Sequence, residues 1–152
     1  MKFEDLRSRM RDRLLFRPQD LHAGRPARPH EIVQLSKWVS RGKLLRLKKG
    51  FYTLAEKKEV SALALAEHLY RPSYVSLEWA LSYYGLIPET AGSPTCVTTL
   101  KTAEFKNSFG HFTYRHIQPA YFWGYVRRSV PAPHWLSWPE KALLDFIYLS
   151  IP

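Results

Sequence analysis

Basic residues are concentrated in the first third of this 152-residue chain, and this asymmetry limits its architecture more than any other feature. Residues 1–57 contain 15 Lys and Arg against 6 Asp and Glu, a net charge of +9, whereas residues 58–152 have a net charge of +1. A basic surface can simply keep a protein in solution. A basic segment joined to a near-neutral one is also typical of a polyanion-binding module fused to a second domain. We therefore expect two domains, over residues 1–57 and 58–152.

The basic segment has three helix signals followed by a hairpin signal. Apolar residues at helical spacing predict a first helix, and they are Phe3, Leu6, Met10 and Leu14. Pro18 at a first helical position and Gly24 beyond the end predict a short second helix. A third helix is predicted from about residue 30 to 41, before Gly42. Residues 43–47 and 51–54 are then expected to form strands around a basic turn at 48–50.

The third helix has one apolar and one polar side. Ile32, Leu35 and Val39 are expected to face the core, with Trp38 at the border. The polar side consists of His30, Gln34, Lys37 and Arg41. Lys and Arg bind phosphates or guanine, and Gln pairs with adenine, so this face suits the major groove. An ordinary amphipathic surface helix has the same pattern, and the helix by itself does not separate the two interpretations.

Three helices followed by a basic hairpin is the order of a winged helix-turn-helix. The third helix would then read the major groove, and the hairpin would contact the DNA backbone. The candidate groove contacts are Arg28, His30, Gln34, Lys37 and Arg41. The candidate phosphate contacts are Lys43, Arg46, Lys48 and Lys49.

Residues 58–152 mix helix and strand signals. Helices are predicted from Val60 to near Arg71-Pro72 and from Leu77 to Tyr84. Strands are predicted over residues 94–101, 111–117 and 120–126. Ser137 and Glu140 have the spacing of a capping box for a last helix, Trp138 to Leu149. That helix is apolar nearly all round, which predicts that it is buried. The expected fold class is α+β: an N-terminal winged helix-turn-helix followed by a smaller mixed α/β domain.

Catalytic and metal-binding patterns are not evident. There is no Gly-rich phosphate loop and no Gly-x-Ser-x-Gly motif, and His111 and His116 are not joined by further ligands at metal-site spacing. A nuclease would need a carboxylate cluster that the sequence does not offer. We expect no enzyme activity, no cofactor and no metal. The single cysteine, Cys96, is expected in the core, and the lack of an apolar run of membrane-spanning length favours a cytoplasmic protein.

Four blocks of the sequence resemble the AbiEi family, the antitoxin half of the type IV abortive-infection systems. They are Leu44 to Tyr52, Tyr74 to Glu89, Phe112 to His116 and Pro139 to Asp145. The resemblance covers roughly residues 30–149. Members of the family usually continue for a helical stretch past the last block, whereas this sequence stops at Pro152, so the second domain is expected to be a truncated form, a short variant or a degenerate copy.

The resemblance implies a function for each domain. The winged helix would bind inverted repeats in its own promoter and repress its operon. The second domain, of the antitoxin type, would counter a co-encoded nucleotidyltransferase-like toxin without forming a stable complex. Two copies are needed for a symmetric site, and they could dimerise only on the DNA. The alternative is a protein-interaction module whose C-terminal domain binds a toxin or another protein, with DNA binding secondary.

Overall fold

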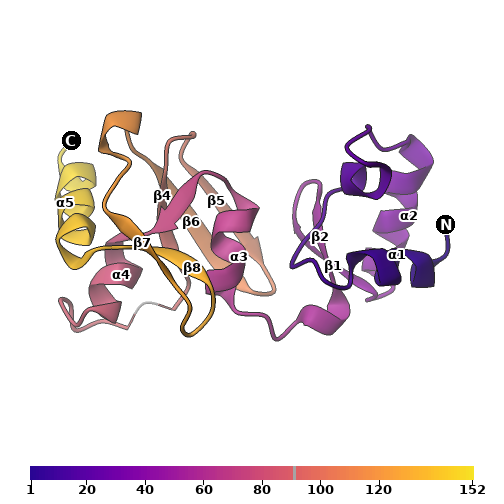
Figure 1. The fold of residues 1–152 in the computed structure, drawn as a ribbon, viewed down its shortest axis with the longest axis horizontal. Helices are drawn as coiled ribbons and strands as arrows, with labels where there is room; N and C mark the ends of the chain where they lie inside the picture. The colour runs from indigo at the N-terminus through magenta and orange to yellow at the C-terminus, as the bar shows by residue number, and fades with distance from the viewer. Residues whose placement is uncertain (91) are drawn as a thin grey trace. The chain divides into compact units, whose positions relative to one another are not determined.

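The computed structural model describes residues 1–90 and 92–152, which divide into two compact units, Met1–Val60 and Ser61–Pro152 (Figure 1). Helices and strands occur in both units, so the chain is of the mixed α+β class. The second unit is the larger of the two, and the expectation of a smaller second domain is therefore wrong. In the described part of the chain, no helix is both long enough and apolar enough to cross a membrane.

The first unit consists of short helices and a two-stranded hairpin. Its elements are α1 (Phe3–Met10), η1 (Pro18–His22), α2 (Pro29–Ser40), β1 (Leu44–Lys48), β2 (Phe51–Leu54) and η2 (Ala55–Lys57). The strands β1 and β2 are antiparallel, with a bulge between Arg46 and Lys48. Phe16 pairs with Tyr52 through two backbone hydrogen bonds of 2.8 and 2.9 Å, which adds one extended residue beside β2.

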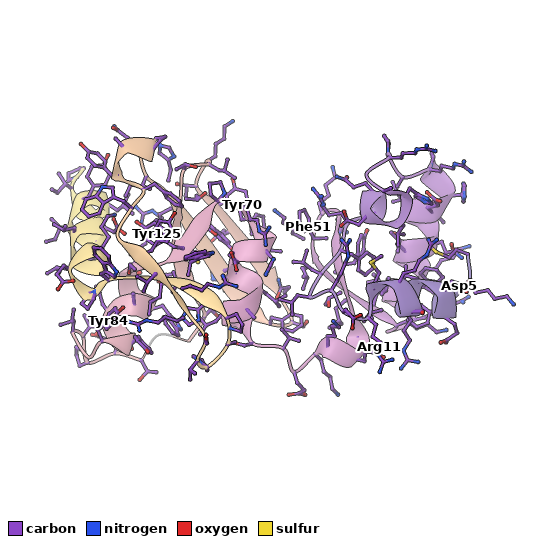
Figure 2. The ribbon with its side chains drawn as sticks, viewed as in Figure 1. Asp5, Arg11, Phe51, Tyr70, Tyr84 and Tyr125 are labelled. Atoms are coloured by element: carbon purple, nitrogen blue, oxygen red, sulfur yellow. The ribbon has the colours of Figure 1, made fainter. Side chains whose placement is uncertain are left out.

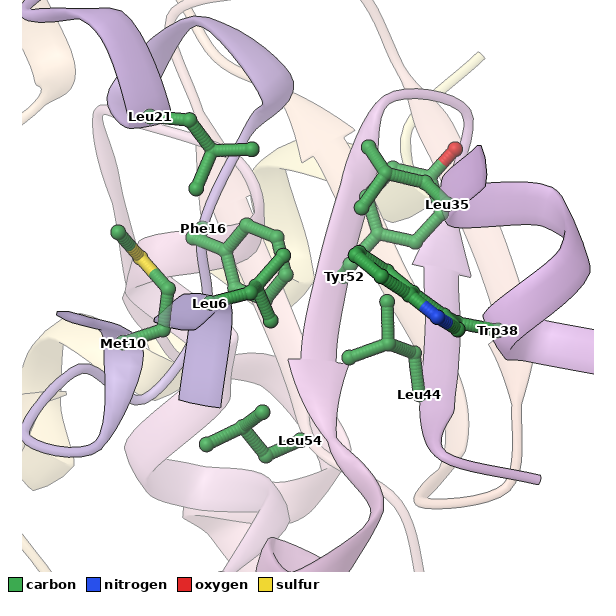
Figure 3. Packing of buried hydrophobic residues seen from close by; sticks show 9 residues of the cluster. All are labelled: Leu6, Met10, Phe16, Leu21, Leu35, Trp38, Leu44, Tyr52 and Leu54. Atoms are coloured by element: carbon green, nitrogen blue, oxygen red, sulfur yellow. The ribbon is translucent and has the colours of Figure 1, made fainter. Parts of the chain in front are cut away.

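One apolar cluster holds this unit together (Figure 3). Its side chains converge from α1, η1, α2 and the hairpin, so each element buries its apolar face against the others. Its buried members are Leu6, Met10, Phe16, Leu21, Leu35, Trp38, Leu44, Tyr52 and Leu54. Leu14 is not among them, because α1 ends at Met10 and the chain must extend before Phe16 to pair with Tyr52. The predicted continuation of the first helix to Leu14 is therefore wrong.

The second unit is a six-stranded sheet with three helices. Its elements are α3 (Ala62–Leu69), β3 (Ser73–Val75), α4 (Leu77–Tyr83), β4 (Thr95–Thr98), β5 (Ala103–Asn107), β6 (Gly110–His116), η3 (Pro119–Tyr121), β7 (Tyr125–Arg128), β8 (His134–Ser137) and α5 (Pro139–Ser150). The strand order is β5-β6-β4-β3-β8-β7, with β3 next to β8 and β4 next to β6 in parallel and the other pairs antiparallel.

The helices lie on both sides of the central strand β3, all of whose residues are buried. Tyr74 in the middle of β3 hydrogen-bonds to Asp145 of α5. Ser73 and Val75, which point the other way, lie with Leu63 of α3 around a small void. Figure 1 shows α3 on one side of the sheet and α4 and α5 on the other. Because β3 is covered on both faces, its sequence does not alternate, which explains why the sequence did not predict it.

Several strands differ from the predictions. Strands β3, β5 and β8 were not predicted, whereas β4 falls within a predicted range and β6 begins and ends one residue before its predicted range. The strand predicted over residues 120–126 is wrong for most of its length. Pro119 begins the 3-10 turn η3 there, and Gly124 has a φ of +77°, so the chain becomes extended only at Tyr125.

The start of α5 also differs from its prediction. Ser137 is the last residue of β8, and its buried Oγ has no hydrogen-bond partner. Trp138 is the residue that precedes the helix, and Pro139 occupies the first helical position. The predicted capping box is therefore wrong. The fixed φ of Pro139 starts the helix without a side-chain cap.

Candidate nucleic-acid interface

The helix α2 begins with a closed cap that involves its one acidic residue. Oε2 of Glu31 accepts a 2.8 Å hydrogen bond from the backbone N–H of Arg28, and Oε1 lies 2.6 Å from Nε2 of His22. The backbone bond from Arg28 lowers the pKa of Glu31, and His22 adds to the effect. The carboxylate thus stabilises the helix N-terminus, where the peptide dipoles favour negative charge. The negative charge of Glu31 is therefore engaged by Arg28 and His22 at the start of α2.

The buried face of α2 is set by Leu35 and Trp38, with Val39 partly buried beside them. Ile32, which was predicted to face the core, is 46% exposed, and its neighbour Val33 is 52% exposed. The prediction for Ile32 is wrong, because the side of the helix that buries Trp38 turns position 32 toward solvent. The outward face of α2 therefore presents two apolar side chains.

The serines of α2 were not singled out from the sequence. Ser36 and Ser40 are exposed on the outward face, and their hydroxyls donate to carbonyl oxygens of Ile32 and Lys37. Each Oγ retains lone pairs that can accept a hydrogen bond from a base. The sequence did hold a sign that part of this helix side is exposed, namely the adjacent apolar residues Ile32 and Val33. Adjacent residues of a helix point in directions about 100° apart, so they cannot both lie at the centre of a narrow apolar stripe that faces the core.

The residues of the predicted polar side of α2 differ in their exposure to solvent. His30, Lys37 and Arg41 are exposed, as is Arg28 just before the helix. Gln34 is only partly exposed, and its Nε2 donates a 2.8 Å hydrogen bond to the backbone carbonyl of Met1. Base recognition by Gln34 would require that this bond be released.

The hairpin holds the four residues predicted to meet phosphates. Lys43 is exposed just before β1, with Nζ 4.8 Å from the ring centre of Phe3, and Arg46 is exposed on β1. Lys49 is exposed at the turn, where Gly50 has a φ of +78° that suits glycine.

Lys48 is in a different environment from Lys49. Its Nζ lies 4.3 Å from the ring centre of Phe51, the residue that begins β2 (Figure 2), and its side chain is partly buried. This burial lowers the pKa of Lys48. The structure thus makes Lys49 the more accessible cation of the turn.

Arginines of the first helix are partly engaged within the unit. Nε of Arg7 donates a 2.8 Å hydrogen bond to Oε2 of Glu56, which raises the pKa of Arg7, and Nη1 of Arg9 donates to the carbonyl of Leu21. Arg11 is exposed and points outward from the chain just past α1 (Figure 2). These contacts fix η1 and η2 against α1.

The second unit contains a buried polar cluster of Tyr74, Ser76, Lys141 and Asp145. The hydroxyls of Tyr74 and Ser76 each donate a 2.8 Å hydrogen bond to Oδ2 of Asp145. Nζ of Lys141 donates to the Tyr74 hydroxyl at 2.9 Å and to Oδ1 of Asp145. Burial, with the Asp145 charge, raises the pKa of Tyr74, so this hydroxyl stays protonated.

The cluster is sealed from solvent. Lys141 is 3% exposed and Asp145 1% exposed. A side chain that no substrate can reach serves structure, and here it fastens α5 to β3. Cys96 is also buried, as predicted, and burial raises the pKa of its thiol. Among residues 1–90 and 92–152, no group of three or more His, Cys, Asp or Glu side chains is placed to hold a metal ion.

No protein-family model matches the chain, and no curated protein matches it.

Proposed function

We propose that the first unit is a winged helix-turn-helix that binds double-stranded DNA, and that the chain is a transcriptional repressor of the AbiEi antitoxin type. The observation that supports this most is the pairing of an outward-facing α2 with a basic hairpin turn in one compact unit. The pair formed by Phe16 and Tyr52 adds the beginning of a third strand to the hairpin, which fixes its position against the helices.

In this proposal α2 lies in the major groove. Lys37 contacts phosphate or guanine, and Ser36 and Ser40 exchange hydrogen bonds with base edges. The exposed methyl groups of Val33 suit contact with the methyl group of thymine. Because Gln34 is bonded to Met1, the serines and Val33 are expected to contribute more to sequence preference than Gln34 does.

The hairpin contacts the sugar-phosphate backbone in this proposal. Arg46 and Lys49 are exposed on its strand and at its turn, with Lys43 at its base. Contacts of this kind position the protein and add affinity for every sequence alike. One module reads one half-site, so two copies about one helical turn apart would bind an inverted repeat.

The experiment is fluorescence anisotropy with a duplex from the protein's own upstream region and a scrambled duplex, over a salt series. We expect tighter binding to the native duplex at about 0.15 M salt, where phosphate attraction alone is weak. Lys49→Ala should weaken both duplexes alike and reduce the salt slope by about one contact. Lys101→Ala, an exposed lysine of the second unit, is the matched control. Equal binding to both duplexes that collapses with salt would refute sequence-specific repression.

The antitoxin part of the proposal rests on the resemblance of the blocks around Tyr74 to Glu89 and Pro139 to Asp145. The buried cluster explains why the second block contains Lys141 and Asp145, since both side chains are members of that cluster. The test is co-expression with a neighbouring nucleotidyltransferase-like reading frame in a bacterial host. Restored growth would support the role, and continued growth arrest with well-expressed protein would count against it.

The alternative role, protein interaction, has one specific observation in its favour. The outward side of α5 carries large apolar side chains that are exposed to solvent. Stable co-purification of a partner in high salt, together with the absence of specific DNA binding, would favour this role over repression.

A further inference from the structure

The helix α5 buries charged side chains and exposes most of its large apolar side chains. Its charged residues Lys141 and Asp145 face the sheet and are buried, together with Ala142. Five of its large apolar residues face solvent, and with the preceding Trp138 and the following Ile151 they are between 37% and 66% exposed, whereas Leu149 packs against the core around Tyr74. The exposed residues are Trp138, Leu143, Leu144, Phe146, Ile147, Tyr148 and Ile151. We call these seven side chains the α5 face.

The reason for this orientation lies in the buried cluster. Asp145 accepts hydrogen bonds from Tyr74 and Ser76 and pairs with Lys141, so the charged side is held inward by partners on β3 and just after it. The opposite orientation would leave those hydroxyls without their acceptor. The exposure of the α5 face therefore follows from a well-satisfied interior.

The α5 face is large enough to need a cover. With roughly 200 Å² for a large side chain about half exposed, seven residues present about 700 Å² of surface. A standard protein interface buries about 800 Å² on each partner, and larger exposed apolar patches mark interaction sites. The exposed aromatic ring of Tyr121, which contacts Tyr148 at 5.2 Å between centroids, extends the patch. One α5 face against another would thus bury at most an area close to that of a standard interface.

The spacing on α5 is self-complementary. Ile147 lies four residues after Leu143 on α5, and Ile151 follows directly after the end of the helix, so Ile147 is near the middle of the exposed apolar residues. In an antiparallel pair of α5 helices related by a twofold axis, Ile147 meets its own copy, and Leu143 meets Ile151 of the other chain. Such a pairing buries these apolar residues against one another.

The charges at the ends of α5 match the same arrangement. Glu140 is exposed in the first turn of α5. Arg115 is exposed at the other end, where its Nη2 donates a 3.3 Å hydrogen bond to the carbonyl of Leu149. An antiparallel pair brings Glu140 of one chain to Arg115 of the other, twice by symmetry. Opposite charges at the rim fix register and orientation.

We propose that the chain forms a twofold-symmetric homodimer through the α5 face, with the two α5 helices antiparallel and Ile147 at the axis. The dimer forms without DNA. It also supplies the two copies that an inverted repeat requires, and in that respect alone it rests on the proposed function.

The first test is the mass of the full chain in solution, without DNA, by light scattering and sedimentation. We expect twice the chain mass of 17.8 kDa at micromolar concentrations. Ile147→Glu should raise the dissociation constant by at least ~100-fold, because two like charges then meet at the axis. Val130→Glu, at an apolar residue 77% exposed outside α5, is the control and should leave the dimer intact. A single-chain mass up to ~100 µM, or association that Ile147→Glu does not weaken, would overturn the proposal and assign the α5 face to another partner.

The second test concerns the antiparallel geometry. Ile147→Cys should give a covalent dimer on mild oxidation, since Cys96 is buried and does not compete. Val130→Cys should not. Glu140→Arg and Arg115→Glu should each weaken the dimer about tenfold, and the double variant should restore it. Losses that add in the double variant would refute this pairing. Both tests are read without DNA, so a failure of DNA binding would leave their outcomes unchanged.

Discussion

Removal of the Asp145 carboxylate should cost more stability than any other single change in the second unit that we consider. Asp145→Ala leaves Lys141 without its counter-ion at 3% exposure and leaves the hydroxyls of Tyr74 and Ser76 without an acceptor. Loss of one partner of a buried ion pair costs about 3–5 kcal/mol. Since a whole domain is stable by about 5–15 kcal/mol, the variant should lie near the threshold of unfolding.

A double substitution separates the cost of a stranded charge from the value of the pair. In Lys141→Met with Asp145→Leu, no charge is left without a partner, and similar volume is kept. Replacing a buried ion pair by apolar residues is often neutral or stabilising. We therefore expect the double variant to be more stable than Asp145→Ala, although it carries two changes. A double variant that is less stable than Asp145→Ala would refute the expected cost of an unpaired buried charge.

The assay is urea unfolding followed by circular dichroism, with tryptophan fluorescence as a second probe. The chain has two compact units, and transitions that do not coincide between the two probes would reveal their separate unfolding. Lys106→Met, an exposed lysine on β5, is the control and should change stability by less than ~0.5 kcal/mol. A loss below ~1 kcal/mol for Asp145→Ala would show that the cluster is open to water and would refute the argument.

Two substitutions, an acid titration and a labelling measurement test other parts of the structure. Glu31→Ala removes the carboxylate that accepts from the N–H of Arg28, so it should lower the thermal midpoint of the first unit by several degrees in a melt followed by circular dichroism. The pKa of Glu31 in the folded state is lowered from 4.5, so its stabilisation is present above that pH and should be lost as the pH falls through the folded pKa. Melts repeated over an acid pH series measure this loss. The Glu31→Ala variant should show less of it. Gly124→Ala should destabilise the second unit by about 1–3 kcal/mol in urea, since a Cβ there would lie 2.8 Å from Cγ of Lys141 at a φ of +77°, and an unchanged midpoint would contradict this contact. The Cys96 thiol should react with an aromatic disulfide reagent only as fast as the chain opens, because it is buried and its pKa is raised, and fast labelling of the native protein would contradict its burial.

Local patterns were enough to predict much of the first unit. The predicted helix over residues 30–41 and the strands around a basic turn are confirmed as α2, β1 and β2. Here the signals are short-range. Pro29 begins the helix α2, Gly42 follows its end with a positive φ, and Gly50 has a positive φ in the hairpin turn. The candidate site on this unit was predicted by residue type, and its DNA contacts stay a prediction.

The same patterns could not say which side chains of α2 remain accessible. Gln34 is held by a carbonyl 33 residues away, and Lys48 by the ring of Phe51 across the turn. Ile32 is exposed because Leu35 and Trp38 together decide the buried side. Each outcome depends on a contact between segments that the sequence pattern treats separately.

Local features of the sequence were enough to show where positive charge is concentrated and to predict α2, the hairpin and a last helix over about residues 138–149. Charge, proline and glycine act locally, so these features need no tertiary contact. Which side of α5 is buried depends instead on contacts that form in the folded second unit. Apolar periodicity favoured an all-round buried helix, but Lys141 and Asp145 find partners at Tyr74 and Ser76, 67 to 71 residues away in the chain. A buried charge is tolerated only when such partners surround it, and those partners come together only in the folded sheet.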